Sequence, residues 1–308
     1  MLGAIALLLG GAVVLTVGAE AAIRGAGLLV RRRGGSLFVL GALLFGVDLE
    51  SLGAALIAAG RGQTSIAAGE AFGTIVFLFS AAFGAALLVS RRPVASPGPV
   101  MVLLPAATVG LGAITLTDSM VTRPEGAVLV VAYALYVGLV LQEGRVARAA
   151  AGHLEREMAE GPRLPPAVLL VGGMALVYGG ATLLVNGGVG ILDRTSLSAG
   201  FVGAALIGAL ASADELLLEI LPVRRGTPEL ATGNLFGTLA AFTTGALGLA
   251  ALIHPLFVDS GAASAYLAAT ALYAVVAIVM LARGQAGRLT GLIVLAGYAA
   301  WIVWAARI

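Results

Sequence analysis

The sequence predicts an all-α integral membrane protein with ten transmembrane helices, built as two inverted repeats of five helices. Of the 308 residues, 60% are hydrophobic and only 11% are charged, and the mean hydropathy is +1.04. A soluble domain carries about 25% charged residues, so this chain cannot cover itself with a polar surface. The other two observations are ten long apolar runs and an internal repeat that contains acidic residues. We therefore expect membrane lipid to surround the chain.

Ten runs are long and apolar enough to cross a bilayer, which takes about 20 helical residues. In chain order they cover residues 2–29, 36–60, 65–89, 98–117, 125–142, 166–190, 198–222, 229–253, 261–282 and 287–306. Arginine, glycine and proline mark the breaks, for example at Arg31 to Gly35, Arg91 to Pro93 and Pro162 to Pro166. The first run lacks a small-residue cleavage site, so we interpret it as a retained helix rather than a signal peptide.

The arginines predict the orientation of these helices. When the loops are sorted by alternate sides, most loop arginines fall on one side, and the other side receives only Arg61, Arg123, Arg194 and Arg307. The positive-inside rule then places the arginine-rich side in the cytoplasm and both termini outside the plasma membrane, which we expect to be the inner membrane of a prokaryote. The first repeat covers residues 1–145, a cytoplasmic linker covers residues 146–165, and the second repeat covers residues 166–308.

The internal repeat is clearest where residues 42–73 are laid over residues 206–237 without a gap. ALLFGVDLESLGAALIAAGRGQTSIAAGEAFG then aligns with LIGALASADELLLEILPVRRGTPELATGNLFG, which pairs Arg61 with Arg225. Further upstream, the stretch from Gly18 to Gly25 matches the stretch from Gly180 to Gly187. Because each half has an odd number of helices, five, the two halves enter the membrane from opposite faces. A site is expected near the midplane.

The repeated motifs resemble those of the calcium/cation antiporter superfamily, which includes sodium/calcium and proton/calcium exchangers. Each repeat of that family carries a pattern close to G-T-S-x-P-E, followed by G-N-x-x-G-S-N. The second repeat of this chain is similar, with Ser212 to Glu215 on the first pattern and Gly233 to Thr238 on the second. The opening G-A-E-x-x-x-R-G at Gly18 to Gly25 is typical of the prokaryotic branch. The resemblance extends over essentially the whole chain.

The resemblance implies a cation site, with departures from the family pattern in the first repeat. Glu215 falls on the central ion-binding glutamate. In the first repeat Ser51 takes that position, and Asp48 lies one turn earlier, where it is expected to share a helix face with Ser51. Glu70 replaces the family's asparagine. The implied cavity holds three carboxylates and several neutral ligands, namely Asp48, Glu70, Glu215, Ser51, Thr74, Ser212, Asn234 and Thr238.

Glu50 and Asp214 occupy the positions where the family has proline, and we include both in the candidate site. Losing both prolines is expected to remove a helix kink and to restore a backbone donor. These acids either line the ion path or pair across the pseudo-symmetry axis. Alternatively, a one-residue register shift makes Glu50 the central acid of the first repeat.

Three further charged residues lie inside apolar runs. Glu219 follows Glu215 by one turn, and we expect it to pair with Arg224 or Arg225, with a place at the mouth of the ion path as the alternative. Glu20 and Arg24 stand four residues apart on the first run and are expected to pair with each other. Their counterparts in the second repeat are Thr182 and Asn186.

The expected function is secondary antiport of a cation. Calcium takes six to eight oxygen ligands from carboxylates, amides, carbonyls and water, and carboxylates that can be protonated let protons compete. The chain has no Cys and its two His stand apart, so a zinc site is not expected. The glycine-rich stretches lack nucleotide-binding spacing, so we expect no nucleotide, no nucleic acid and no cofactor. The oligomeric state is left open.

The leading hypothesis is exchange of Ca²⁺ for Na⁺ or H⁺ by alternating access. The first alternative is a proton-coupled antiporter of the same fold retuned to Mg²⁺, Mn²⁺, Na⁺ or K⁺. A passive cation channel and an intramembrane hydrolase are less favoured, the latter because the acids fall on repeat-related positions rather than forming a nucleophile and base.

Overall fold

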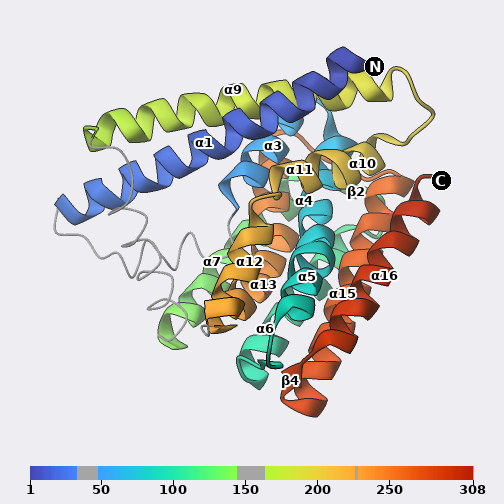
Figure 1. The fold of residues 1–308 in the computed structure, drawn as a ribbon. Helices are drawn as coiled ribbons and strands as arrows, with labels where there is room; N and C mark the ends of the chain where they lie inside the picture. The colour runs from blue at the N-terminus through green and yellow to red at the C-terminus, as the bar shows by residue number, and fades with distance from the viewer. Residues whose placement is uncertain (33–47, 144–163, 226–227, 308) are drawn as a thin grey trace.

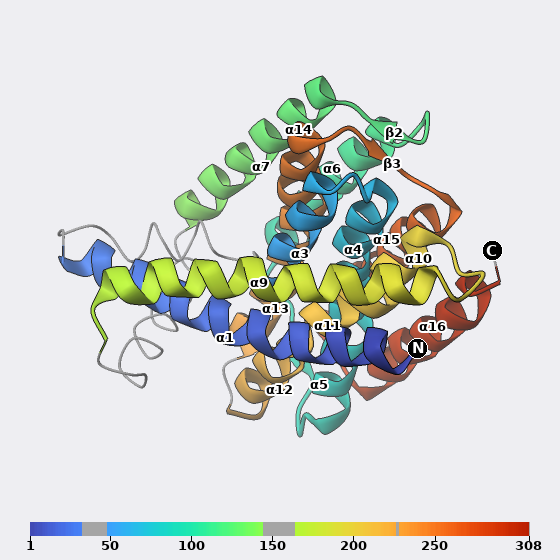
Figure 2. The same cartoon turned by 90° about the horizontal axis from the view of Figure 1, so that it is seen from above.

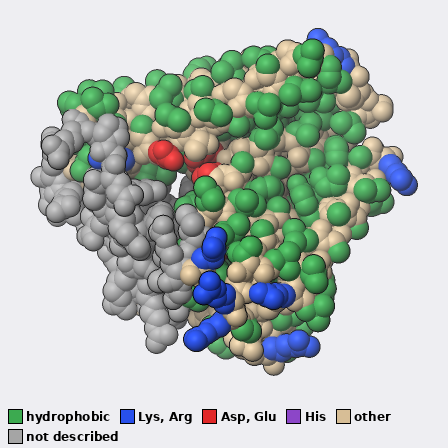
Figure 3. Space-filling view, viewed as in Figure 1, with side chains coloured by type: hydrophobic (Ala, Val, Ile, Leu, Met, Phe, Trp, Pro, Cys, Tyr) green, Lys and Arg blue, Asp and Glu red, His purple; other side chains and the backbone are tan. Residues whose placement is uncertain are grey.

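Helices form almost all of the protein (Figure 1), for which a computed structural model describes residues 1–32, 48–143, 164–225 and 228–307. The predicted all-α class is confirmed, with only four two-residue strands in these ranges. Large apolar side chains stand on the outside of many helices: Leu2, Ile114 and Val171 are 85%, 67% and 69% exposed. Figure 3 shows such side chains over most of one face. In a membrane protein these side chains face lipid, not water.

Helices α1 (Leu2–Arg32) and α9 (Pro166–Leu192) run antiparallel, side by side, across the remaining helices (Figures 1 and 2). A Cβ on Gly18 would lie 2.6 Å from the backbone nitrogen of Val177, and one on Gly180 would lie 2.5 Å from that of Leu15. No side chain fits in such contacts, so the two backbones touch directly. The glycines that make this contact recur every seven residues on both helices, at Gly11, Gly18, Gly25, Gly173, Gly180 and Gly187.

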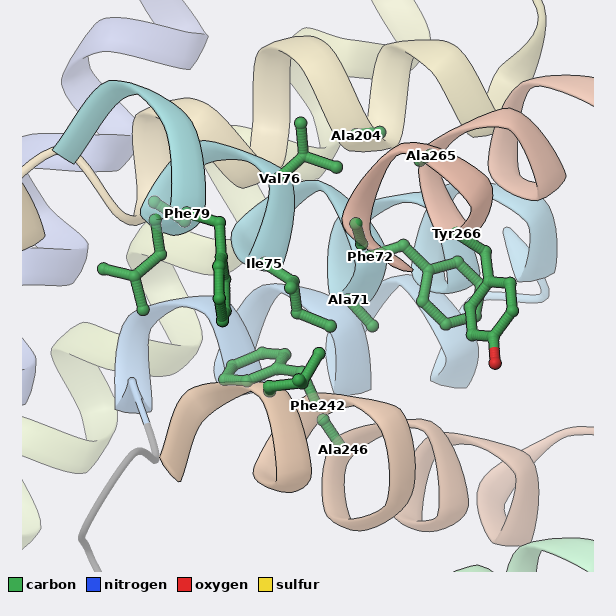
Figure 4. Close-up of a cluster of buried hydrophobic side chains, with 14 of the residues drawn as sticks. Ala71, Phe72, Ile75, Val76, Phe79, Ala204, Phe242, Ala246, Ala265 and Tyr266 are labelled. Carbon is green, nitrogen blue, oxygen red and sulfur yellow. The ribbon is translucent and has the colours of Figure 1, made fainter. Parts of the chain in front are cut away.

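Two interrupted helices form the centre of the bundle. One consists of α4 (Thr64–Phe77), the π-helical turn η1 (Leu78–Ala82) and α5 (Phe83–Val89); the other consists of α13 (Pro228–Ala240), η3 (Ala241–Ala246) and α14 (Leu247–Ile253). In the most apolar 18-residue stretch of each, 72% and 83% of the residues are buried. The corresponding share is 28–44% in the other described helices that are long enough to cross a membrane. Figure 4 shows the apolar cluster between them, in which Phe72 packs edge-on against Tyr266.

The central helices α4 and α13 carry part of the predicted site, and the other predicted residues lie on or next to helices that pack against them. In the first repeat, α3 (Leu49–Gly60) begins directly after Asp48. In the second repeat, α10 (Ala199–Val202), η2 (Gly203–Gly208) and α11 (Ala209–Ala211) are followed by α12 (Glu215–Arg225), with a bend of 60° at the break.

The bend at Ser212 to Asp214 corrects the expectation that losing proline removes the kink. The backbone of Ser212 leaves the helical conformation (φ −97°, ψ 18°), and its carbonyl accepts a tight bond from the Glu215 amide, three residues on, at 3.1 Å. The Asp214 carbonyl then accepts from Leu217 and begins a new helix. The break therefore persists without proline, because polar groups at the site replace the continuous helical ladder.

Four outer helices flank the centre, namely α6 (Pro99–Thr115), α7 (Arg123–Glu143), α15 (Ser260–Arg283) and α16 (Arg288–Ala305). Two short strand pairs link them: β1 (Val94–Ala95) pairs antiparallel with β4 (Gln285–Ala286), and β2 (Met120–Val121) pairs with β3 (Leu256–Phe257). β1 and β3 take the same place in the two halves, as do β2 and β4. Exchanging the halves therefore converts one strand pair into the other.

The described helices only partly account for the ten predicted spans. Seven are long and apolar enough to cross a membrane, or eight if the bent pair is one span, while α3 and α6 are shorter apolar helices. The predicted run 36–60 begins within residues 33–47, outside the described ranges, as does nearly all of the predicted linker 146–165. The count of ten stays a prediction.

Candidate cation-binding site

Asp48 caps the start of α3 and accepts hydrogen bonds from both repeats. Its Oδ1 accepts from the Ser51 backbone amide at 2.9 Å, and its Oδ2 accepts from the Ser51 hydroxyl at 2.6 Å. The Ser212 hydroxyl, from the break before α12, donates to the same Oδ2 at 2.8 Å. This corrects the expectation that Asp48 stands on a helix face one turn before Ser51. It precedes the helix as an N-cap residue, and its side chain turns back onto Ser51.

The contacts continue from Ser212 to a second buried acid. The Ser212 hydroxyl lies 3.3 Å from that of Thr74, which donates to Oε1 of Glu70 at 3.3 Å. Oε2 of Glu70 has no hydrogen-bond partner among the described residues, although the side chain is fully buried. We call this connected set the oxygen chain: Asp48, Ser51, Ser212, Thr74 and Glu70.

A second group of polar residues lies on α12 and α13. Nδ2 of Asn234 donates to Oε2 of Glu215 at 2.6 Å and lies 3.2 Å from Oε1 of Glu219. Thr238 stands one turn after Asn234, is 1% exposed, and its hydroxyl has no partner in the described part of the chain. Residues four apart share a helix face, so Thr238 lies on the same side of α13 as Asn234.

Glu50 and Asp214 lie beside the other acids. Glu50 is 5% exposed, and its carboxyl group interacts electrostatically with those of Asp48 and Asp214. The Glu215 carboxyl group interacts with Asp48, Asp214 and Glu219. This arrangement favours the interpretation in which Glu50 and Asp214 meet across the two halves. Acids from both repeats therefore face one another near the centre of the protein.

The acids do not form a compact metal cluster. Within the residues that the structure describes, no three His, Cys, Asp or Glu side chains lie close enough together to hold a metal ion. Hydroxyl and amide groups separate the carboxylates: Ser212 and Thr74 stand between Asp48 and Glu70, and Asn234 stands between Glu215 and Glu219. The predicted cavity with Asp48, Glu70 and Glu215 around one ion stays a prediction.

One contact that the sequence did not indicate joins α3 to the α1–α9 pair. Arg61, at the end of α3, donates to Oδ1 of Asn186 at 2.5 Å and to the Thr182 hydroxyl at 3.3 Å. Both acceptors lie on α9 at the positions that correspond to Glu20 and Arg24 in the first repeat. No signal in the sequence indicated this contact, because it depends on α3 packing against α9.

The α1 charges occupy different surroundings. Arg24 is buried and Glu20 is exposed, and Glu20 interacts electrostatically with Asp214 of the break. In Figure 3 acidic side chains show in a hollow beneath α1, next to the residues drawn in grey. The predicted pairing of Glu20 with Arg24 stays a prediction.

Comparison with known proteins gives the family. A model of the sodium/calcium exchanger protein family matches residues 3–142 and 166–307. The chain belongs to this family. It is thus a membrane transporter and a cation antiporter, as the resemblance of its motifs implied.

Relatives and solved structures agree with this membership. The chain is 28% identical over 274 residues to the putative antiporter CaxA of Alkalimonas amylolytica, with 85% of each chain covered. It is 28% identical over 317 aligned positions to the inner membrane protein YrbG of Escherichia coli (strain K12), covering 98% of this chain and 96% of that one. Structures of the sodium-calcium exchanger NCX_Mj soaked with Na⁺ and Sr²⁺ superpose with a TM-score of 0.63 at 20% identity, over 98% of both chains. That likeness establishes the fold.

Proposed function

We propose that this antiporter exchanges Ca²⁺ for Na⁺ or H⁺ by alternating access across the plasma membrane of a prokaryote. The oxygen chain is the observation that carries the proposal, because it joins an acid of the first repeat to the second repeat through Ser212. A site shared by two halves can open to one side of the membrane at a time when the halves shift relative to each other.

The chemistry of the oxygen chain suits a hard cation. Its ligands are carboxylate and hydroxyl oxygens, the donors that Ca²⁺ prefers. The hydroxyl groups of Ser51, Ser212 and Thr74 supply one hydrogen each, whereas Asp48 and Glu70 offer four carboxylate oxygens in addition to the hydroxyl oxygens. A bound cation or added protons can balance the negative charge of these two carboxylates. The same oxygens can thus bind the cation and the protons in turn, as exchange requires.

The second candidate is a proton-coupled exchanger of another cation, Mg²⁺, Mn²⁺, Na⁺ or K⁺. Glu70 stands where the family has asparagine and Asp48 where it has serine, so the first repeat carries its charge at unusual positions. Moving a carboxylate changes both the size of the site and the charge around the ion, and these properties set selectivity.

Several features support an inverted repeat with the predicted orientation. The corresponding helices α1 and α9 run antiparallel, and the strand pairs β1–β4 and β2–β3 convert into each other when the halves are exchanged. In the lower part of Figure 3, basic side chains gather at the end of the bundle where Figure 1 shows β4. We propose that this end faces the cytoplasm and that both termini lie outside.

Uptake of radioactive calcium into proteoliposomes tests the proposal. One set of vesicles is loaded with Na⁺ and diluted into Na⁺-free buffer, and a second set is given a proton gradient. We expect one of these two ion gradients to drive calcium into the vesicles against the calcium gradient. Uptake driven by neither gradient would contradict calcium antiport. Uptake of Mg²⁺, Mn²⁺ or K⁺ in its place would favour the second candidate, and calcium flux without any counter-ion requirement would indicate a channel.

A further inference from the structure

Glu219 is a buried acid that the oxygen chain does not use. Its side chain is fully buried on α12, and Oε2 has no hydrogen-bond partner among the described residues. A carboxylate inside a membrane costs free energy unless it is compensated, so such a residue marks a functional position.

The expected pairing of Glu219 with Arg224 does not account for this burial, and the alternative pairing with Arg225 stays a prediction. Arg224 is exposed, and the side chain of Arg225 lies outside the described ranges. Five residues along a helix correspond to a rotation of about 140°, so Arg224 does not share the face of Glu219 on α12. The described partner of Glu219 is Asn234.

Asn234 takes a position between two carboxylates. Its single Nδ2 atom contacts Oε2 of Glu215 at 2.6 Å and Oε1 of Glu219 at 3.2 Å. Ionised carboxylates only accept hydrogen bonds. The two hydrogens of the amide nitrogen therefore supply the partial positive charge that both carboxylates require. A cation at the same place would satisfy the two acids more strongly, and rotation of the amide by half a turn would turn its oxygen toward that cation.

The group that points to a ligand here is Oε2 of Glu219, which is fully buried and which no described residue satisfies. Thr238, whose buried hydroxyl also has no partner in the described part of the chain, stands one turn farther along α13 from Asn234. We propose that Glu219 forms, with Glu215 and Asn234, a second subsite for a divalent cation, which extends one helical turn from Glu215 toward the Arg224 end of α12. This inference rests on the proposed function, since it assigns a further ligand to the same transported ion.

The subsite exists in only one half of the protein. The residue that corresponds to Glu219 in the first repeat is Ala55, which is buried and cannot ligate a cation. The two ends of the ion path therefore differ in charge although the helices around them repeat. Two carboxylates balance the charge of a divalent ion, which is why the subsite selects Ca²⁺ over Na⁺. Glu215, a member of the subsite, also interacts electrostatically with Asp48 of the oxygen chain.

Calcium titration by calorimetry of the purified protein in lipid nanodiscs tests this assignment. Glu219→Gln keeps the shape and an acceptor for Asn234 but removes the charge, and it is expected to weaken calcium binding about tenfold or more, because charge count sets calcium affinity. Asp118→Asn is the matched control: it removes an exposed carboxylate and keeps an acceptor for the Met120 amide, so binding should be unchanged.

The outcomes separate this inference from the proposed function. If Glu215→Gln loses calcium binding while Glu219→Gln binds like the parent, the subsite is wrong and the proposed function stands. If the parent itself binds no calcium, both are wrong. If Glu219→Gln does not fold, anomalous scattering from strontium-soaked crystals of the parent decides: a peak at coordination distance from Glu219 is expected, and a peak only at the oxygen chain would overturn the subsite.

Discussion

Ser212 donates its hydroxyl hydrogen to the carboxylate of Asp48 at 2.8 Å, although the two residues are 164 positions apart in the sequence. Both side chains are buried, and they belong to different repeats. A hydrogen bond to a carboxylate is among the stronger ones in proteins, and losing one partner inside a membrane protein leaves a polar group unsatisfied. This contact therefore joins the two halves at the point where we place the transported cation.

Asp48→Asn should abolish transport while leaving the fold intact. Asparagine caps helices as well as aspartate does, so α3 should still begin at Leu49. The substitution removes one negative charge from the oxygen chain, and we expect calcium uptake to fall to the background of empty vesicles. Melting temperature in detergent should stay close to that of the parent. Full uptake by Asp48→Asn would show that this carboxylate is not a ligand.

Glu70→Asn would restore the residue that the family pattern has at this position. Glu70 is fully buried and Oε2 lacks a partner among the described residues, so its charge is uncompensated without a cation or proton. We expect the substitution to weaken calcium binding and to reduce the competition between protons and calcium, measured as calcium affinity at several pH values. Unchanged competition would exclude Glu70 from the exchange.

Cross-linking α3 to α9 should stop transport reversibly. Arg61 holds Thr182 and Asn186 of α9 by two hydrogen bonds at one end of α3. The chain has no cysteine, so the double substitution Arg61→Cys and Asn186→Cys introduces the sole pair. Because the contact joins the far ends of two side chains, a reducible bifunctional thiol cross-linker should link the two cysteines. If α9 moves relative to α3 during exchange, cross-linking should block calcium uptake and a reducing agent should restore it. Arg61→Cys alone is the control, and undiminished uptake by the cross-linked protein would show that this contact stays in place during transport.

Two adjacent glycines of α9 should respond oppositely to alanine. A Cβ on Gly180 would meet the backbone nitrogen of Leu15 at 2.5 Å, whereas nothing lies within 4 Å of a Cβ on Gly179. Gly180→Ala should separate α1 from α9 and destabilise the protein by about 1–3 kcal/mol. Gly179→Ala should be neutral or stabilising, because alanine favours a helix by about 1 kcal/mol over glycine. Melting temperatures of the two variants check this, and equal values would contradict the direct backbone contact.

The sequence was sufficient to predict the membrane class, the family and most of the residues that the structure brings together. Glu215 and Ser212 could be placed because their spacing to Asn234 and Thr238 follows a family motif. The apolar runs were recognisable because lipid-exposed helices need long apolar stretches.

The details that were missed depend on contacts that helical spacing does not reveal, some of them local and some between segments distant in the chain. The N-cap position of Asp48 and the bend at Ser212 to Asp214 arise from local hydrogen bonds at the site, which helical spacing does not reveal. The contact of Glu219 with Asn234 could not be predicted, because it requires α12 and α13 to be packed together. The seven-residue glycine spacing of α1 and α9 is present in the sequence. It does not by itself show that these two helices pack against each other.

Calcium uptake driven by a counter-ion gradient, compared between the parent and Glu215→Gln, tests the central claim most directly. Glu215 belongs to the Glu219 subsite and interacts electrostatically with Asp48 of the oxygen chain and with Glu219. We predict gradient-driven uptake by the parent and none by Glu215→Gln at equal amounts of folded protein. Equal uptake by the two proteins, or no gradient-driven uptake by the parent, would contradict calcium exchange at this site.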